Sequence, residues 1–312
     1  MQIIFFGSDQ YSLLVLKCLA KQENLVVKLV VTTRPKPVGR DHVPTPTPVE
    51  KYAVNQNIKV SYYPNNIEEI SKFINMLEIT PSTHGLSASF PRIVPHSLVL
   101  AFAGRLYNLH PSLLPQYRNV APVPYAIALG EHVTGITLFR IGEGIDNGQI
   151  LTQIEEPIYV IDTTPILLTR LFEKGVDLFI NWLVNPTLVP TPQPHRETNK
   201  LIFTRKLTRD SGYVEWPVIL KLIENSALSP LDTNNPLVKL RLTHFPDRNN
   251  NVLFDLIRAL EGYEKIWTIA DTKKDQLQIS LHLQTPHSPL YSVLISGKPN
   301  PIPWNNFAKY YL

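Results

Sequence analysis

Three side chains near the middle of this chain have the types needed to move an acyl group between nitrogens. Asn108 and His110 stand in the run NLHPSLLP, and Asp146 follows in the glycine-flanked run GIDNG. An amide and a charged imidazole can hold the oxyanion of a tetrahedral intermediate, and a carboxylate can orient the imidazole or accept the amine proton. Spacing alone leaves open a plainer interpretation, a strand-end amide beside a capping histidine, with Asp146 in an ordinary turn.

Alternating strand and helix patterns in the first half of the chain are expected to position these residues. Mostly apolar runs at 2–6 and 26–32 suit central parallel strands buried on both faces. Residues 11–21 and 66–77 carry apolar side chains at helical spacing. This alternation predicts a doubly wound, mostly parallel α/β sheet of Rossmann-like type, which binds ligands at the carboxyl ends of its strands.

The first strand-to-helix junction, GSDQ at residues 7–10, argues against one large class of ligand. It has no G-x-G-x-x-G pattern, so the sequence gives no support to an NAD or FAD site. Ser8 or Asp9 is instead expected to cap the following helix through a backbone N–H group.

The composition describes an ordinary globular protein large enough for two domains. The chain has 312 residues, of which 44% are hydrophobic and 18% charged, and a formal net charge of +4. This charge permits an anionic partner without requiring one. The single cysteine, Cys18, excludes an intrachain disulfide, and no Cys/His grouping has zinc-site spacing.

The chain opens directly on a strand pattern, which leaves no room for a signal or transit peptide. No apolar run reaches the roughly 18 residues that a membrane helix needs. We therefore expect a cytoplasmic protein with no membrane partner and no obligate protein partner.

A Pro-rich segment marks the expected boundary between two domains. A long helix is predicted at 163–184, and the segment 185–204 that follows it is predicted to be a semi-rigid extended linker. The expected catalytic domain is thus 1–184, and the expected C-terminal domain is 205–312. Apolar and polar residues alternate in three segments of this second domain, which predicts a smaller, β-rich and barrel-like domain: 237–243, 276–283 and 291–295.

The two runs at 108–127 and 134–151 together resemble the folate-dependent formyltransferase family, most closely its members that formylate methionyl initiator tRNA. The resemblance is strongest before residue 151 and continues through five further segments: 5–19, 32–53, 205–217, 256–267 and 297–307.

The resemblance implies transfer of a formyl group from 10-formyltetrahydrofolate, a co-substrate, to the amino group of methionyl initiator tRNA. It implies that Asn108, His110 and Asp146 are catalytic and that no metal takes part. Two rivals remain open. One is folate-dependent formylation of a small amine, either an amino sugar nucleotide or glycinamide ribonucleotide. The other is a non-catalytic RNA-binding relative. Hydrolysis of formylfolate without an acceptor is a third possible outcome.

The same resemblance implies a folate site on the loop after His110. Its expected lining residues are Ser112, Leu113, Leu114 and Pro115. Phe90 is a further expected folate contact by stacking, although filling the core is an equally simple role for it. Two positions depart from the family. Pro91 replaces an expected glycine, and so does Asn119, which tolerates positive φ better than most residues.

The segment 34–48 is an unusually long connection for an α/β unit, and it is basic. Its length and basic residues suit a disordered loop that becomes ordered on phosphate or RNA. The resemblance matches Arg40 to an arginine that engages the acceptor tRNA. Arg34 and Lys36 are expected to assist it. The alternative is a solvated basic surface loop.

Overall fold

The computed structural model describes residues 1–38, 41–185, 189–193, 201–285 and 288–312, and it divides into two compact units. Unit one comprises Met1–Arg118, Gly135–Glu156 and Leu168–Ile202. Unit two comprises Asn119–Thr134, Pro157–Leu167 and Phe203–Leu312. The last change from unit one to unit two therefore falls inside the segment 185–204 that we propose as a linker.

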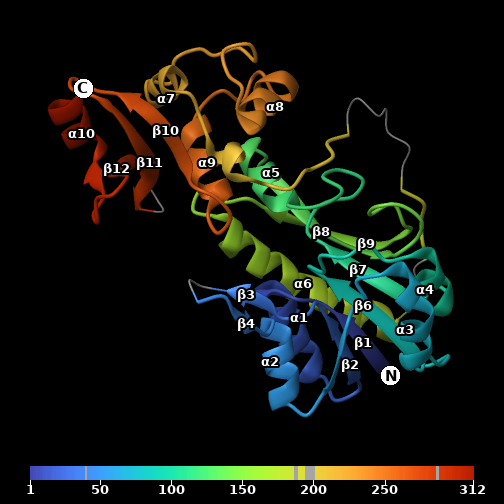
Figure 1. Cartoon of the computed structure of the whole chain (residues 1–312). Helices are drawn as coiled ribbons and strands as arrows, with labels where there is room; N and C mark the ends of the chain where they lie inside the picture. The colour runs from blue at the N-terminus through green and yellow to red at the C-terminus, as the bar shows by residue number, and fades with distance from the viewer. Residues whose placement is uncertain (39–40, 186–188, 194–200, 286–287) are drawn as a thin grey trace. The chain divides into compact units, whose positions relative to one another are not determined.

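A seven-stranded sheet with the order β5-β2-β1-β6-β7-β8-β9 forms the centre of unit one (Figure 1). Its strands are β1 (Gln2–Phe6), β2 (Val26–Thr32), β5 (Lys59–Tyr62), β6 (Thr83–Ala88), β7 (Leu106–His110), β8 (Val133–Arg140) and β9 (Ile150–Pro157). The pairs from β5 through to β7 are parallel, and β8 runs antiparallel to β7. The mostly parallel sheet predicted from the sequence is confirmed, with β1 and β2 at the predicted residues.

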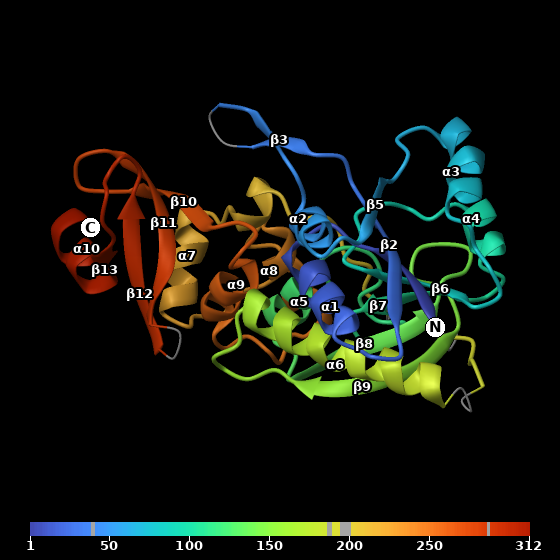
Figure 2. The ribbon, with the colours of Figure 1, turned by 90° about the horizontal axis from the view of Figure 1, so that it is seen from below.

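Helices cover both faces of this sheet (Figure 2). They are α1 (Gln10–Ala20), α2 (Pro48–Asn55), η1 (Ile67–Glu69), α3 (Ile70–Met76), α4 (His96–Ala101) and α6 (Thr164–Val184). The helices predicted at 11–21, 66–77 and 163–184 are confirmed, and Asp9 caps α1 by accepting the N–H groups of Tyr11 and Ser12. Strand side chains alternate between the two faces, so both faces are apolar and need a cover. Ile4 and Phe6 pack against side chains of α3 and α4. Tyr107 lies on the other face and packs against Phe179 of α6.

Unit two combines an antiparallel sheet with helices. The sheet has the order β10-β11-β12-β13, with β10 (Ile266–Asp271), β11 (Gln276–Thr285), β12 (Ser288–Ile295) and β13 (Ile302–Pro303). The helical elements are α5 (Pro122–Ala128), η3 (Arg209–Gly212), α7 (Trp216–Ile223), α8 (Pro236–His244), α9 (Val252–Leu260) and α10 (Trp304–Tyr311). The strands predicted at 276–283 and 291–295 are confirmed within β11 and β12.

The strand predicted at 237–243 is wrong, because this segment is helix α8. Asn235 caps the helix by accepting the N–H groups of Leu237 and Val238, both at 3.0 Å, and Pro236 occupies the first turn. An Asn cap followed by proline is a helix-start signal, and here it prevails over the apparent alternation.

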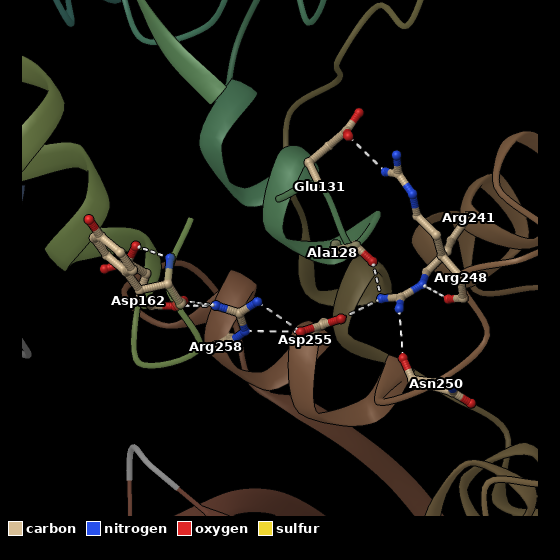
Figure 3. A network of polar contacts seen from close by, with 9 residues as sticks. Ala128, Glu131, Asp162, Arg241, Arg248, Asn250, Asp255 and Arg258 are labelled. Carbon is tan, nitrogen blue, oxygen red and sulfur yellow. Dashed lines mark hydrogen bonds and ion pairs between the residues drawn. The ribbon is translucent and has the colours of Figure 1, made fainter. Parts of the chain in front are cut away.

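Two buried arginines share one carboxylate in the interior of unit two (Figure 3). Arg241 of α8, only 2% exposed, donates to Asp255 Oδ2 at 2.7 Å, and Arg258 donates to Asp255 Oδ1 at 2.9 Å. Arg241 also donates to the Ala128 carbonyl of α5, and Arg258 to the Asp162 carbonyl. Burial lowers the pKa of Arg241, and the charge of Asp255 opposes that shift. The network thereby ties the segments Asn119–Thr134 and Pro157–Leu167 to α8 and α9.

We expect Asp255→Ala to destabilise unit two by about 3–5 kcal/mol, because it leaves two buried guanidinium groups without their counter-charge. Denaturant unfolding monitored by circular dichroism measures the change. The control is Asp247→Ala, which removes an exposed carboxylate from the loop after α8. Equal midpoints for the two variants would show that the network contributes no net stability.

Candidate active site

Strand β7 carries two of the three predicted catalytic residues at its carboxyl end. Asn108 pairs with Ser87 on β6 and Phe139 on β8, and His110 pairs with Thr137 on β8. Because side chains alternate along a strand, Asn108 and His110 project from the same face of the sheet. His110 is 4% exposed, whereas Asn108 is half-buried. Among the described residues, the Asn108 side chain has no hydrogen-bond partner, so its amide is open to a bound group.

The two ring nitrogens of His110 have different surroundings. Nε2 lies 2.9 Å from the backbone carbonyl oxygen of Tyr117. A carbonyl can only accept, so Nε2 carries a hydrogen in either charge state. Nδ1 lies 3.5 Å from Oδ2 of Asp146. Nδ1 is therefore the nitrogen that gains or loses a proton, and it faces the carboxylate predicted to act with it.

The loop between β8 and β9 holds Asp146 in a tight turn. Asp146 has φ +47°, in the left-handed region that aspartate tolerates better than most residues. A Cβ atom on Gly148 would lie 1.7 Å from the Arg140 carbonyl oxygen, so only glycine fits there. The run GIDNG is therefore a turn, as its composition indicates, and this turn directs the Asp146 carboxylate toward His110.

The loop after β7, which carries the residues predicted to line a folate site, is fixed by polar side chains of β8 and β9. Thr137 donates to the Ser112 carbonyl at 2.6 Å and accepts from the Leu114 N–H group at 3.2 Å. Gln153 donates to Thr137 at 2.7 Å and to the Leu114 carbonyl at 3.0 Å. The hydroxyl of Ser112 is itself buried and donates to the Gln116 carbonyl. These contacts connect the loop backbone to the neighbouring strands β8 and β9.

The remaining predicted folate residues differ in exposure. Leu113 is half-buried, whereas Leu114 and Pro115 are buried, and Leu114 packs with Phe139 and Ile150. Phe90 packs edge-on against Phe6 and Tyr63, with ring centroids 5.8 Å and 5.3 Å away. This packing favours the core-filling role that the sequence left open for Phe90.

Asn119 has φ +81°, which confirms that asparagine here adopts a backbone conformation suited to glycine. Its side-chain amide donates to the Thr204 carbonyl at 3.0 Å. The change from glycine therefore preserves the turn.

The basic segment 34–48 is not a structureless loop, contrary to our expectation. It forms a separate two-stranded antiparallel hairpin of β3 (Lys36–Val38) and β4 (Val43–Thr45), in which Pro37 lies opposite Pro44. Two facing prolines are compatible with an antiparallel ladder where neither residue has to donate a bond. Arg34 and Lys36 are exposed, and Arg34 lies over the Tyr62 ring at 5.5 Å. Arg40 lies outside the described residues.

Sequence reasoning missed four residues that organise this site: Arg118, Thr137, Gln153 and Gln193. Thr137 is a polar residue within the apolar strand TGITLFR, and that interruption was its only signal. The other three are ordinary polar residues whose role depends on contacts far along the chain.

Within the described ranges, no group of three or more His, Cys, Asp or Glu side chains is arranged to hold a metal ion. The helices in the described part of the chain include none that is both long and apolar enough to cross a membrane.

Comparison with known proteins gives concordant results. The sequence model of a family described as "Formyl transferase" matches residues 1–183. A relative from Bacillus mycoides, named methionyl-tRNA formyltransferase, is 35% identical over 219 residues, which are 69% of this chain and 68% of that protein. Another relative with the same name, from Caldicellulosiruptor saccharolyticus, is 30% identical and covers 72% of this chain and 71% of its own length.

Solved structures of formyltransferases are similar over most of the chain, and one of them illustrates the likeness. It is an N-formyltransferase from Helicobacter canadensis, crystallised with folinic acid and dTDP-3-aminofucose. The TM-score is 0.54 at 19% identity, with 93% of this chain and 94% of that chain covered. At this identity the similarity concerns the fold alone.

Proposed function

This chain belongs to the formyl transferase family and is a formyl-transferring enzyme, and on that basis we propose that it formylates the α-amino group of methionyl initiator tRNA with 10-formyltetrahydrofolate as donor. The observation that carries this proposal is the similarity to relatives named methionyl-tRNA formyltransferase over 69–72% of the chain.

The arrangement of the site supports a simple sequence of steps. The neutral amine nitrogen bonds to the formyl carbon, and the formyl oxygen becomes an oxyanion. The Asn108 amide and the Nδ1–H of protonated His110 stabilise that oxyanion. Asp146 accepts the amine proton, and its carboxylate also holds the His110 imidazole in the productive orientation. The oxyanion then re-forms the carbonyl as the bond from the formyl carbon to the folate nitrogen breaks, and that nitrogen takes up the proton that the acceptor amine lost and leaves as tetrahydrofolate. These steps require no metal ion.

We assign donor binding to the loop at 112–115, beside His110. The fixed conformation of this loop supports the assignment, because Thr137 and Gln153 hold its backbone from the neighbouring strands. A preformed loop loses less conformational freedom when a ligand binds. Phe90 packs edge-on against Phe6 and Tyr63, and stacking on folate stays the alternative role for it.

The proposal is tested by coupling donor use to product formation. With labelled formyl donor, we expect tetrahydrofolate release to equal the amount of N-formylmethionine recovered from charged initiator tRNA. Uncharged tRNA is the control and should support no transfer. Equal donor turnover with and without charged tRNA would indicate a formylfolate hydrolase and contradict the proposal.

The basic segment 34–48 provides a test of tRNA binding. We expect Arg40→Ala to weaken tRNA binding and to reduce the salt dependence of log K by about one phosphate contact, roughly 0.9 in slope for a duplex. Donor turnover without acceptor should not change. The matched control is Lys72→Ala, an exposed lysine on α3. Unchanged tRNA kinetics for Arg40→Ala at several salt concentrations would show that the basic segment is only a solvated surface.

A further inference from the structure

Gln193 lies in the segment that follows α6, outside the seven-stranded sheet, and its side chain contacts the loop that carries Asp146. Thr191 and Ile150 exchange backbone hydrogen bonds of 2.8 Å and 2.9 Å, which places this segment beside the start of β9. Gln193 is 8% exposed, an unusual degree of burial for a polar residue in a Pro-rich connection.

Both ends of the Gln193 amide are engaged. Its Nε2 donates to the Asp146 carbonyl at 2.7 Å and to the Gly148 carbonyl at 2.9 Å. Its Oε1 accepts from Arg118 Nε at 3.1 Å and from Arg118 Nη2 at 2.6 Å. Because a guanidinium only donates and a carbonyl only accepts, the orientation of this amide is unambiguous. The amide therefore fixes the backbone on both sides of Asn147.

These contacts close a ring around the His110 imidazole. Arg118 directly follows Tyr117, whose carbonyl accepts the hydrogen of His110 Nε2. From Arg118 the contacts pass through Gln193 to the backbone of Asp146, whose carboxylate faces His110 Nδ1 at 3.5 Å. This ring of contacts thus positions both the Tyr117 carbonyl at Nε2 and the Asp146 carboxylate at Nδ1.

The backbone of Asp146 needs such support. A non-glycine residue at φ +47° is strained, and strained residues persist where their surroundings over-determine the conformation. The two carbonyls that Gln193 holds belong to Asp146 itself and to Gly148.

We propose that Gln193 is a positioning residue of the formyl transfer reaction: it holds the Asp146 loop so that the carboxylate faces Nδ1 of His110, and Arg118 orients the Gln193 amide for this task. The inference rests on the proposed function of the Asn108, His110 and Asp146 site. Gln193 touches no reacting atom and acts only through Asp146.

Gln193→Met keeps the length of the side chain and removes both donated and both accepted bonds. We expect kcat to fall by roughly 10- to 10²-fold, with KM for the acceptor nearly unchanged, because a small displacement of a catalytic group has such effects. Thr191→Val is the matched control, since it alters an exposed side chain of the same segment and leaves its backbone bridge intact.

A double-mutant cycle separates positioning from mere structural support. If Gln193 acts only through Asp146, then adding Gln193→Met to Asp146→Asn should lower kcat less than twofold further. Full additivity of the two losses would overturn the proposal, and so would a near-normal kcat for Gln193→Met. Arg118→Lys provides a second cycle if Gln193→Met does not fold, with the same expectation and the same refuting outcome. The cycle uses whichever acceptor the wild-type enzyme formylates, so its outcome does not depend on whether that acceptor is methionyl initiator tRNA.

Discussion

Asp146→Asn is expected to lower kcat for formyl transfer by roughly 10²-fold or more, with KM for the tRNA acceptor little changed. The substitution keeps the size of the side chain and much of its hydrogen bonding, but it removes the charge and the basicity. The carboxylate faces the one nitrogen of His110 that can exchange a proton, 3.5 Å away. The loss therefore falls on the chemical step rather than on binding.

Steady-state kinetics measure this effect, after circular dichroism confirms that the variant is folded. The matched control is Glu143→Gln, which removes a charge from an exposed side chain of the same connection between β8 and β9. A near-normal kcat for Asp146→Asn would show that GIDNG is only a turn, and the proposed mechanism would have to be abandoned.

His110→Asn is expected to produce a loss of similar size, because an amide cannot carry the positive charge that stabilises the oxyanion. Asn108→Ala should also act mainly on kcat. The residues work as one unit, so His110→Asn combined with Asp146→Asn should be little slower than either variant alone. His96→Asn, at an exposed histidine on α4, is the control.

Multiplication of the two losses in the double variant would contradict this account. It would mean that His110 and Asp146 contribute independently, and their proximity in the structure would then have no mechanistic meaning.

Much of the fold of unit one could be predicted because its signals are local. Apolar runs identify β1 and β2, helical spacing identifies α1 and α3, and the acidic cap at Asp9 marks a helix start. The positive φ at Asn119 could also be anticipated, because few residues replace glycine at such a position.

Unit two was harder to predict because its local signals conflict. Val238, Leu240 and Leu242 fit a strand alternation, and the Asn235 cap decides in favour of the helix. The buried arginines Arg241 and Arg258 appear in sequence as ordinary solvated charges, since their shared carboxylate is recognised only in three dimensions.

The candidate site was likewise predictable only in part. Residue types and family resemblance singled out Asn108, His110 and Asp146, and their roles stay predictions for kinetics to test. The role of Gln193 could not be read from sequence, because it stands 47 positions from Asp146 and its partners are backbone carbonyls. Every residue type has a backbone carbonyl, so the sequence gives no sign of which residue accepts such a hydrogen bond.

The central claim is that the acceptor is the amine of methionyl initiator tRNA, and a competition experiment tests it most directly. Wild-type enzyme receives limiting labelled formyl donor with equal concentrations of charged initiator tRNA, charged elongator tRNA, an amino sugar nucleotide and glycinamide ribonucleotide. The partition of label reports the ratios of kcat/KM among these acceptors. Our account predicts that nearly all label appears as N-formylmethionine on the initiator tRNA. Equal or greater labelling of either small amine would contradict it.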